Sequence, residues 1–174
     1  MASKKKTEGQ DTTEITMQNL LRLYRNCQAV YEEGLFGWTI DSKIKRIGKS
    51  AKEAIEYKIG EELTANYQRR KEIEDELREP YKDVPYDKAN DVEYKENLKK
   101  NKEFVDLYKR EEEMWKITLP DFLFVPVKVK ITDDVNEKIT KPERMITFRD
   151  RPFPVGVYAA LGDLIDDGYI VETT

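Results

Sequence analysis

Hydrophobic residues recur every three or four positions over the first two thirds of the chain, which is the pattern of amphipathic helices. The first stripe predicts a helix over residues 13–33, followed by a turn over residues 35–40 that packs on the core. A short helix is expected from about residue 41. A new capping pattern at Ser50 predicts a long helix that runs to Pro80, with a kink where the two helices meet.

Prolines and polar turn formers fill residues 80–92, so the chain is expected to reverse there. The next apolar stripe predicts a helix over residues 92–115. This helix and the long helix before it each carry a stripe that neither can bury alone, which predicts that they pack antiparallel. The first helix is expected to pack against this hairpin.

The hydrophobic period changes to two after residue 116. Alternating β-branched and aromatic residues, interrupted by prolines, predict one or two edge strands within residues 117–131 and a returning strand within residues 138–149. A short helix over residues 153–164 and a last strand at residues 169–171 follow, and this strand could join the β-hairpin as a third member. The predicted fold class is therefore α+β, predominantly α: an antiparallel helical hairpin plus an N-terminal helix, with a small C-terminal antiparallel sheet and short helix.

The length of 174 residues is that of one ordinary domain, which we divide into three parts. Residues 1–12 are expected to form a flexible polar tail, because they offer almost nothing apolar to bury. Residues 13–116 form the helical hairpin region, and residues 117–174 form the small β-hairpin and helix region.

Composition excludes several kinds of chemistry. The chain contains no histidine, which rules out a Ser-His-Asp triad and imidazole metal ligands. Its lone cysteine, Cys27, permits no intramolecular disulfide and lies on the stripe of the first helix, where a buried thiol is expected. No stretch approaches the roughly 20 apolar residues of a membrane span, and the polar start lacks a secretory signal. We therefore expect a cytoplasmic protein without membrane contacts.

Five positive charges and no negative charge fall within ten residues near the start of the long helix. This basic segment could contact the phosphates of a nucleic acid, an anionic membrane surface or an acidic protein. The alternative interpretation is a solvated face balanced by the acids from Glu53 onward, and the net charge of −4 argues against general coating of nucleic acid. The candidate partner-binding residues of this segment are Lys43, Lys45, Arg46, Lys49 and Lys52.

The ten tyrosines suggest a second candidate contact. Tyrosine is enriched at protein interfaces, and three of the ten cluster at the predicted tip of the hairpin. They could form an exposed contact point, or they could simply cover the end of a thin core. These candidate partner-binding residues are Tyr81, Tyr86 and Tyr94.

No pattern predicts a cofactor or a catalytic residue. The run Gly48–Ser50 lacks the earlier glycine and the preceding strand of a phosphate-binding loop. Converging carboxylates could bind Mg²⁺ or Ca²⁺, and the best candidates are Asp163, Asp166 and Asp167. Either Arg149 or Arg151 could instead offset the repulsion among these acids. We expect no cofactor and no metal.

A resemblance bears on function. A short basic helix with Lys43, Arg46 and Lys49 precedes a long charged helix with residues 69–73 (RRKEI), and a helix with residues 103–107 (EFVDL) follows. In this order the chain resembles small helical accessory proteins encoded in tailed-phage genomes. The resemblance implies a virion component or an assembly component without catalytic residues.

The leading hypothesis is a non-enzymatic structural or assembly protein that binds other proteins within a larger assembly, in the host cytoplasm or in a virion. It could also form homo-oligomers. The first alternative is a nucleic-acid-associated regulator that uses the basic segment, residues 43–52. The second alternative is a hydrolase or transferase that uses the cluster around Asp163.

Overall fold

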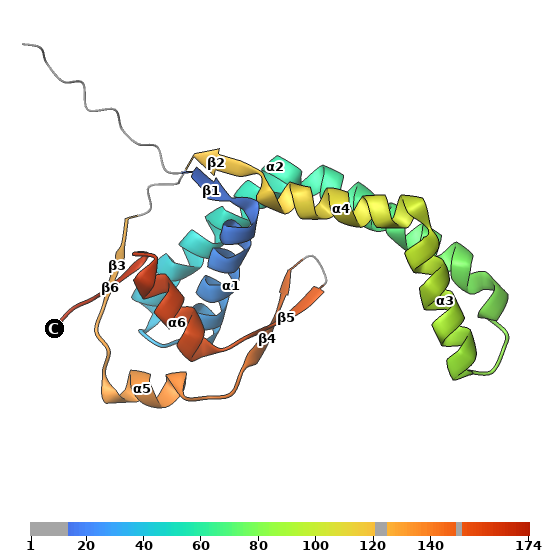
Figure 1. Ribbon diagram of the computed structural model, residues 1–174. Coiled ribbons are helices and arrows are strands. Elements are labelled where there is room, and N and C mark those ends of the chain that lie inside the picture. The colour runs from blue at the N-terminus through green and yellow to red at the C-terminus, as the bar shows by residue number, and fades with distance from the viewer. Residues whose placement is uncertain (1–13, 121–124, 149–150) are drawn as a thin grey trace, which may run out of the picture.

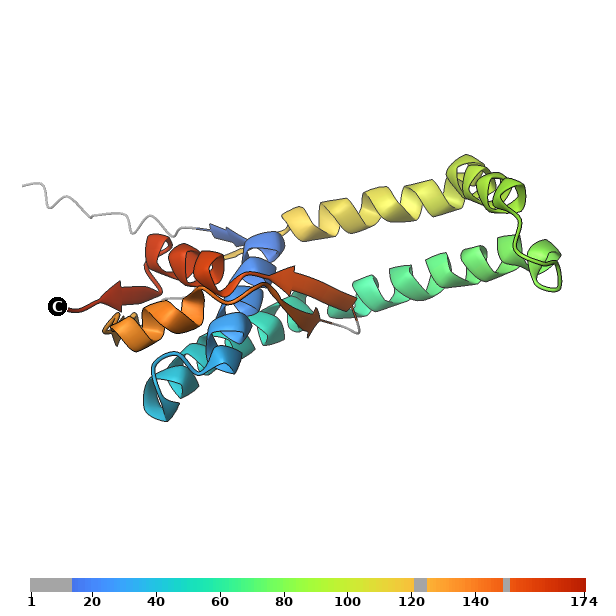
Figure 2. The same ribbon diagram turned by 90° about the horizontal axis from the view of Figure 1, so that it is seen from below.

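The computed structural model describes residues 14–120, 125–148 and 151–174. Figures 1 and 2 show a body, formed by the N-terminal and C-terminal elements, from which an arm of helices projects to one side. The expected tail of residues 1–12 lies outside the described residues, as do Phe122, Phe124 and Arg149.

The first helix begins later than the sequence pattern predicts. A short strand, β1 (Glu14–Thr16), pairs antiparallel with β2 (Thr118–Pro120) and precedes helix α1 (Met17–Glu33). The Thr16 hydroxyl accepts a hydrogen bond from the backbone N–H of Asn19 at 3.1 Å, so Thr16 caps the helix. The helix ends as predicted at Gly34, whose φ of 65° is the left-handed conformation that glycine tolerates.

Helix α2 (Trp38–Arg78) is one uninterrupted helix of 41 residues. The predicted turn that packs on the core is confirmed for residues 35–37, since Leu35 belongs to the hydrophobic core, but residues 38–40 already belong to α2. The predicted boundary between two helices before Ser50 is wrong. Gly48, which suggested a break, is instead buried where α2 crosses α1. A Cβ atom at this position would lie 2.8 Å from the Cβ of Cys27. The glycine thus serves close helix packing rather than a chain break.

The arm returns through three short elements: the 3₁₀ turn η1 (Glu79–Tyr81), α3 (Lys88–Lys100) and α4 (Lys102–Lys116). The single helix predicted over residues 92–115 is therefore wrong, because the chain breaks at Asn101. The side chain of Asn101 accepts a hydrogen bond from the N–H of Phe104 at 2.9 Å and caps α4. Helix α4 packs back against α2, which confirms the predicted helical hairpin.

The C-terminal strands pair differently from the prediction. Strand β3 (Val127–Val129) pairs in parallel with β6 (Ile170–Glu172) instead of with a returning strand. The predicted turn after residue 131 is a helix, α5 (Asp133–Ile139), and this helix separates β3 from β4 (Arg144–Phe148). Strand β4 pairs instead with the next strand along the chain.

That next strand occupies the start of the predicted helix over residues 153–164. Strand β5 (Arg151–Val155) pairs antiparallel with β4, and helix α6 (Val157–Asp166) begins only afterwards. The last strand, β6, does not join this β-hairpin. The C-terminal strands thus form separate two-stranded sheets rather than one sheet of three strands.

Helix α1 lies at the centre of the body, between α2 and α6. Its residues Met17, Leu20, Ala29 and Val30 are fully buried. They belong to one hydrophobic cluster that also includes side chains of the first half of α2, of α6 and of the short strands. Helices dominate the described residues and the sheets are small, so the predicted α+β, predominantly α, fold class is confirmed.

Candidate functional site

The basic segment lies on the first half of α2, and four of its five side chains are exposed. We call these five residues the basic face. Neither Lys43 nor Arg46 forms an ion pair with any residue that the structure describes. Trp38, the first residue of α2, is 79% exposed just before them. Lys43, Arg46 and an exposed indole thus lie within nine residues of one helix.

The other three cations of the basic face have partners within the protein. The Nζ of Lys45 donates a hydrogen bond to the hydroxyl of Tyr31 at 3.0 Å. Lys49 and Lys52 form ion pairs of 3.6 and 3.8 Å with glutamates one helical turn further along α2. Exposed pairs of this kind are weak, so a phosphate or a partner's carboxylate could displace them. A ligand could therefore contact Lys43 and Arg46 without first breaking an ion pair to a described residue.

Polar contacts hold the arm together. We define the arm as residues 64–116, because the hydrophobic core of the body ends at Leu63 on α2 and resumes at Met114 near the end of α4. The buried guanidinium of Arg70 pairs with the carboxylate of Glu111, and the side-chain amide of Asn66 donates to the carbonyl of Leu107 at 2.8 Å. These contacts join α2 to α4 near the base of the arm.

Further out, the arm depends on exposed charges and a thin apolar seam. Arg69 donates to both carboxylate oxygens of Glu103, at 2.7 and 3.0 Å, which is a bidentate pair between α2 and α4. The buried hydrophobic side chains of the arm, apart from Met114 at its base, are Ile73, Tyr94 and Phe104. Few apolar contacts therefore hold the outer part of the arm.

A hollow of about 380 Å³ lies at the end of the arm, and we call it the tip hollow. All three tyrosines predicted to cluster at the tip line it. Tyr86 is 84% exposed and Tyr81 is half-buried, whereas Tyr94 is buried and its hydroxyl accepts a hydrogen bond from Arg78 at 3.4 Å. The hollow is lined by Arg78, Tyr81, Val84, Pro85, Tyr86, Asp87, Asn90, Asp91 and Tyr94.

Two of the three candidate acids at the end of α6 have partners on α1. Asp167 forms an ion pair with Arg22 at 2.9 Å, and Asp163 accepts a hydrogen bond from the side-chain amide of Asn26 at 3.0 Å. The prediction that Arg151 offsets these acids is wrong, because Arg151 pairs with Glu111 at 3.4 Å. The other predicted partner, Arg149, is not among the described residues. Within those residues, no group of three or more potential ligands could hold a metal ion.

Cys27 is 1% exposed and packs against α2 at Gly48. Burial raises the pKa of its thiol to about 12, so the thiol stays protonated at neutral pH. The buried structural role expected from the sequence fits this environment.

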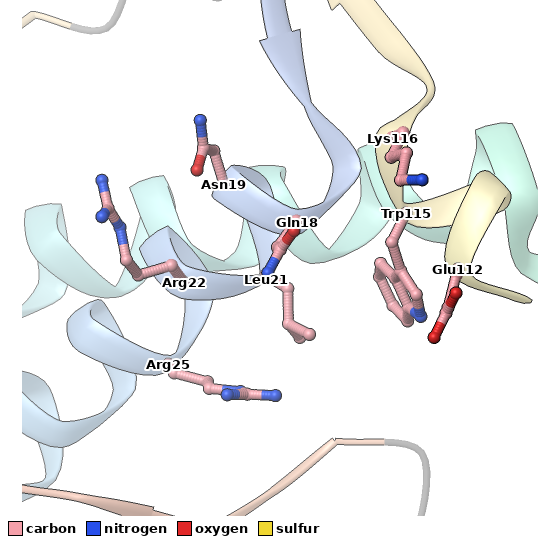
Figure 3. Close-up of a pocket in the computed structure, with 8 residues that line it drawn as sticks. All are labelled: Gln18, Asn19, Leu21, Arg22, Arg25, Glu112, Trp115 and Lys116. Atoms are coloured by element: carbon pink, nitrogen blue, oxygen red, sulfur yellow. The ribbon is translucent and has the colours of Figure 1, made fainter.

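A larger hollow of about 560 Å³ lies between the start of α1 and the end of α4, and we call it the α1–α4 cleft. Figure 3 shows Arg25 extending from α1 into the space beside Trp115 and Glu112. The guanidinium carbon of Arg25 lies 3.4 Å from the ring centre of Phe153, and its Nε is buried without a hydrogen-bond partner. Burial lowers the pKa of Arg25. The cleft is lined by Gln18, Asn19, Leu21, Arg22, Arg25, Glu112, Trp115 and Lys116.

An aromatic cleft of about 420 Å³ shares Trp115 with the α1–α4 cleft. Its walls include Tyr67, Phe148 and Phe153. Arg151 lies at this cleft, with its guanidinium 5.1 Å from the Tyr67 ring centre and an ion pair to Glu111. The carboxylate of Glu111 in this cleft is therefore already paired with a cation of the protein, Arg151.

Sequence reasoning missed Trp38, Arg25 and Trp115 as candidate site residues. The spacing of Arg22 and Arg25 contained a usable signal, because arginines three apart on a helix share a face. The sequence contained no such signal for Trp38. The helix that begins there is preceded by Gly37, which has no side chain that could form a recognisable cap. Trp115 was assigned to an apolar stripe, and its place between two clefts depends on tertiary packing.

Comparison of the chain with protein-family models, with curated proteins and with solved structures gave no match. None of the helices in the described residues is both long enough and apolar enough to cross a membrane.

Proposed function

We propose that the protein is a non-enzymatic assembly protein that binds another protein through the tip hollow. The observation that carries the proposal is the position of exposed apolar side chains at the end of a projecting arm. Val84 is 49% exposed and Tyr86 is 84% exposed, and both line the tip hollow. A partner's apolar side chain could fill the hollow, with the polar groups around it forming hydrogen bonds at the rim.

The construction of the arm supports this proposal. Ion pairs and a buried hydrogen bond join α2 to α4, yet the arm adds little to the hydrophobic core of the body. An arm of this kind presents its tip at a defined position away from the body, where a partner can reach it from several sides (Figure 2). The resemblance to accessory proteins of tailed phages favours the same class of function.

The test compares two exposed tyrosines. Tyr86→Ala removes the most exposed ring of the tip hollow, and Tyr57→Ala removes a 91% exposed ring on α2 outside the hollow. Proteins captured from the native source by the wild type and by Tyr57→Ala, but lost with Tyr86→Ala, are the expected partners. Each candidate is then purified and titrated, and we expect Tyr86→Ala to weaken its binding by about tenfold or more. A compact monomer in sedimentation that captures no partner contradicts the proposal.

The second candidate function is nucleic-acid binding through the basic face. The specific observation in its favour is that Lys43 and Arg46 are exposed and unpaired among the described residues, next to the exposed Trp38. Titration with DNA and RNA at two salt concentrations tests it, because phosphate contacts weaken steeply with salt. Lys43→Glu combined with Arg46→Glu should weaken such binding and lower its salt dependence. Unchanged affinity and unchanged salt dependence in this variant rule out the basic face as the binding site.

A further inference from the structure

Arg25 extends from α1 into the α1–α4 cleft, where its guanidinium is partly buried against an aromatic ring. Its guanidinium carbon lies 3.4 Å from the ring centre of Phe153, so the guanidinium packs closely against this ring. It forms no ion pair with a described carboxylate, and its Nε is buried without a partner. A buried Nε without an acceptor is costly. The terminal Nη groups form no hydrogen bond with a described residue, and a bound oxyanion would satisfy these groups.

The nearby charges distinguish Arg25 from the other cations of the α1–α4 cleft. Arg22 forms an ion pair with Asp167, and Lys116 forms one with Glu113 at 2.7 Å. Glu112 is the acid that lines the cleft. Arg25 is therefore the one cation of this lining that has no ion pair with a described carboxylate.

The cleft also has the dimensions of a small-molecule site. Its volume of about 560 Å³ lies within the range of ligand pockets. Leu21 and Trp115 offer apolar surface beside the guanidinium, and the side chains of Gln18 and Asn19 offer amide groups. This combination suits a ligand that joins an oxyanion to an apolar or aromatic body.

We propose that the α1–α4 cleft binds the oxyanion group of a small organic phosphate or carboxylate, with Arg25 as its principal contact. The free edge of the guanidinium binds two oxygens of the anion, and the body of the ligand packs against Trp115. Phosphate esters and carboxylates share this chemistry, so the experiment must distinguish them. The proposal is independent of the tip hollow and of the basic face.

Three aromatic probes test the proposal by isothermal titration calorimetry on the full chain. Phenyl phosphate carries a phosphate, benzoate carries a carboxylate, and phenol carries neither. We expect saturable binding of at least one anion at millimolar concentrations and none of phenol. The tighter of the two anions identifies the source of the oxyanion. Absence of saturable binding by both anions, or equal binding of phenol, overturns the proposal.

Variants then assign the binding to Arg25. Arg25→Lys keeps the charge but loses the planar fork, and we expect it to weaken binding by about 10- to 100-fold, the range for a lost charged hydrogen bond. Arg110→Gln is the matched control, because Arg110 lies on α4 outside the cleft and pairs weakly with Glu62 at 3.8 Å. Equal weakening by both variants overturns the assignment.

A variant that should bind the anion more tightly provides a control, because unfolding can only weaken binding. Glu112→Gln removes the carboxylate that repels an anion in the cleft, so we expect tighter binding of the same probe at low salt. A damaged fold cannot produce this result. Affinity that is unchanged or reduced in Glu112→Gln, measured on protein with a wild-type circular dichroism spectrum, contradicts an anion in this cleft.

Discussion

Gly48 sets the distance between α1 and α2, and its replacement by alanine tests that packing. The Cβ of an alanine at this position would lie 2.8 Å from the Cβ of Cys27 and 3.5 Å from the carbonyl oxygen of Tyr24. Both Cβ atoms are fixed to helical backbone and cannot rotate away. The two helices must therefore move apart, which disturbs the core around them.

Two opposing terms decide the size of the effect. Alanine stabilises the interior of a helix relative to glycine by about 1 kcal/mol. Overpacking in a well-packed core costs about 1–3 kcal/mol, and contact between two fixed atoms belongs to the upper part of that range. We therefore expect Gly48→Ala to lower the free energy of unfolding by about 1–2 kcal/mol, which corresponds to about 2–4 °C in Tm for each kcal/mol.

Urea denaturation followed by circular dichroism measures this change. Gly162→Ala in α6 is the matched control, since a Cβ there meets no atom within 4 Å. It should stabilise the protein by up to about 1 kcal/mol. The double variant Cys27→Gly with Gly48→Ala moves the Cβ from one helix to the other. We expect a coupling free energy of about 1 kcal/mol or more in this cycle.

The opposite sign of the effect would refute the reasoning. If Gly48→Ala is as stable as Gly162→Ala, or more stable than the wild type, the α1–α2 contact is looser than 2.8 Å implies. A coupling near zero in the double-variant cycle would lead to the same conclusion. The central role given to α1 in the body would then lose its support.

Three further predictions concern single side chains. A hydrogen bond from Lys141 at 2.8 Å lowers the pKa of Glu33, so this carboxylate stabilises the protein above its unfolded pKa and loses that effect as the pH falls through its lowered folded-state pKa. Glu33→Gln should cost about 1–2 kcal/mol at pH 7 in urea denaturation, and its urea midpoint should approach that of the wild type as the pH falls through the lowered pKa. Asn101→Ala removes the side-chain oxygen that accepts a hydrogen bond from the N–H of Phe104 and caps α4. We expect it to lower the free energy of unfolding by about 1 kcal/mol in urea denaturation. Cys27, with its pKa raised by burial to about 12, should react with a thiol reagent only in step with unfolding, and rapid labelling in native buffer would contradict its burial.

Much of the helical architecture could be predicted because it depends on local periodicity. The stripe of α1 and the left-handed end at Gly34 both follow from the sequence pattern. Gly48 shows where this reasoning fails. A glycine in a helical pattern is compatible with a break in the helix and with close packing against another helix. Which of the two occurs here depends on Cys27, which lies 21 positions away. Tertiary packing overrode the local preference.

The strand pairing could not be predicted for a related reason. Strands of three to five residues contain too few alternating positions to fix a partner. The sequence indicated β-structure in residues 117–131, yet the pairing of β3 with β6 depends on where α5 and α6 carry the chain. The hairpin between β4 and β5 was hidden by Pro152 and Pro154, which argued against a strand. Both prolines occupy alternate positions on β5, a strand whose other side pairs with no described strand.

Whether a candidate surface could be predicted depended on how close its residues lie in the sequence. Clusters within one stretch of sequence were visible: the basic face lies within ten residues, and the tyrosines of the tip hollow flank one turn. The α1–α4 cleft was invisible, because Arg25 and Trp115 are separated by 90 positions and meet through the fold alone. A surface made from one segment can act without the body, but a cleft made from two helices exists only when both are packed. Anion binding at Arg25 should therefore disappear together with the packing of α1 and α4, whereas salt-dependent phosphate contacts of the basic face require only that α2 remain helical.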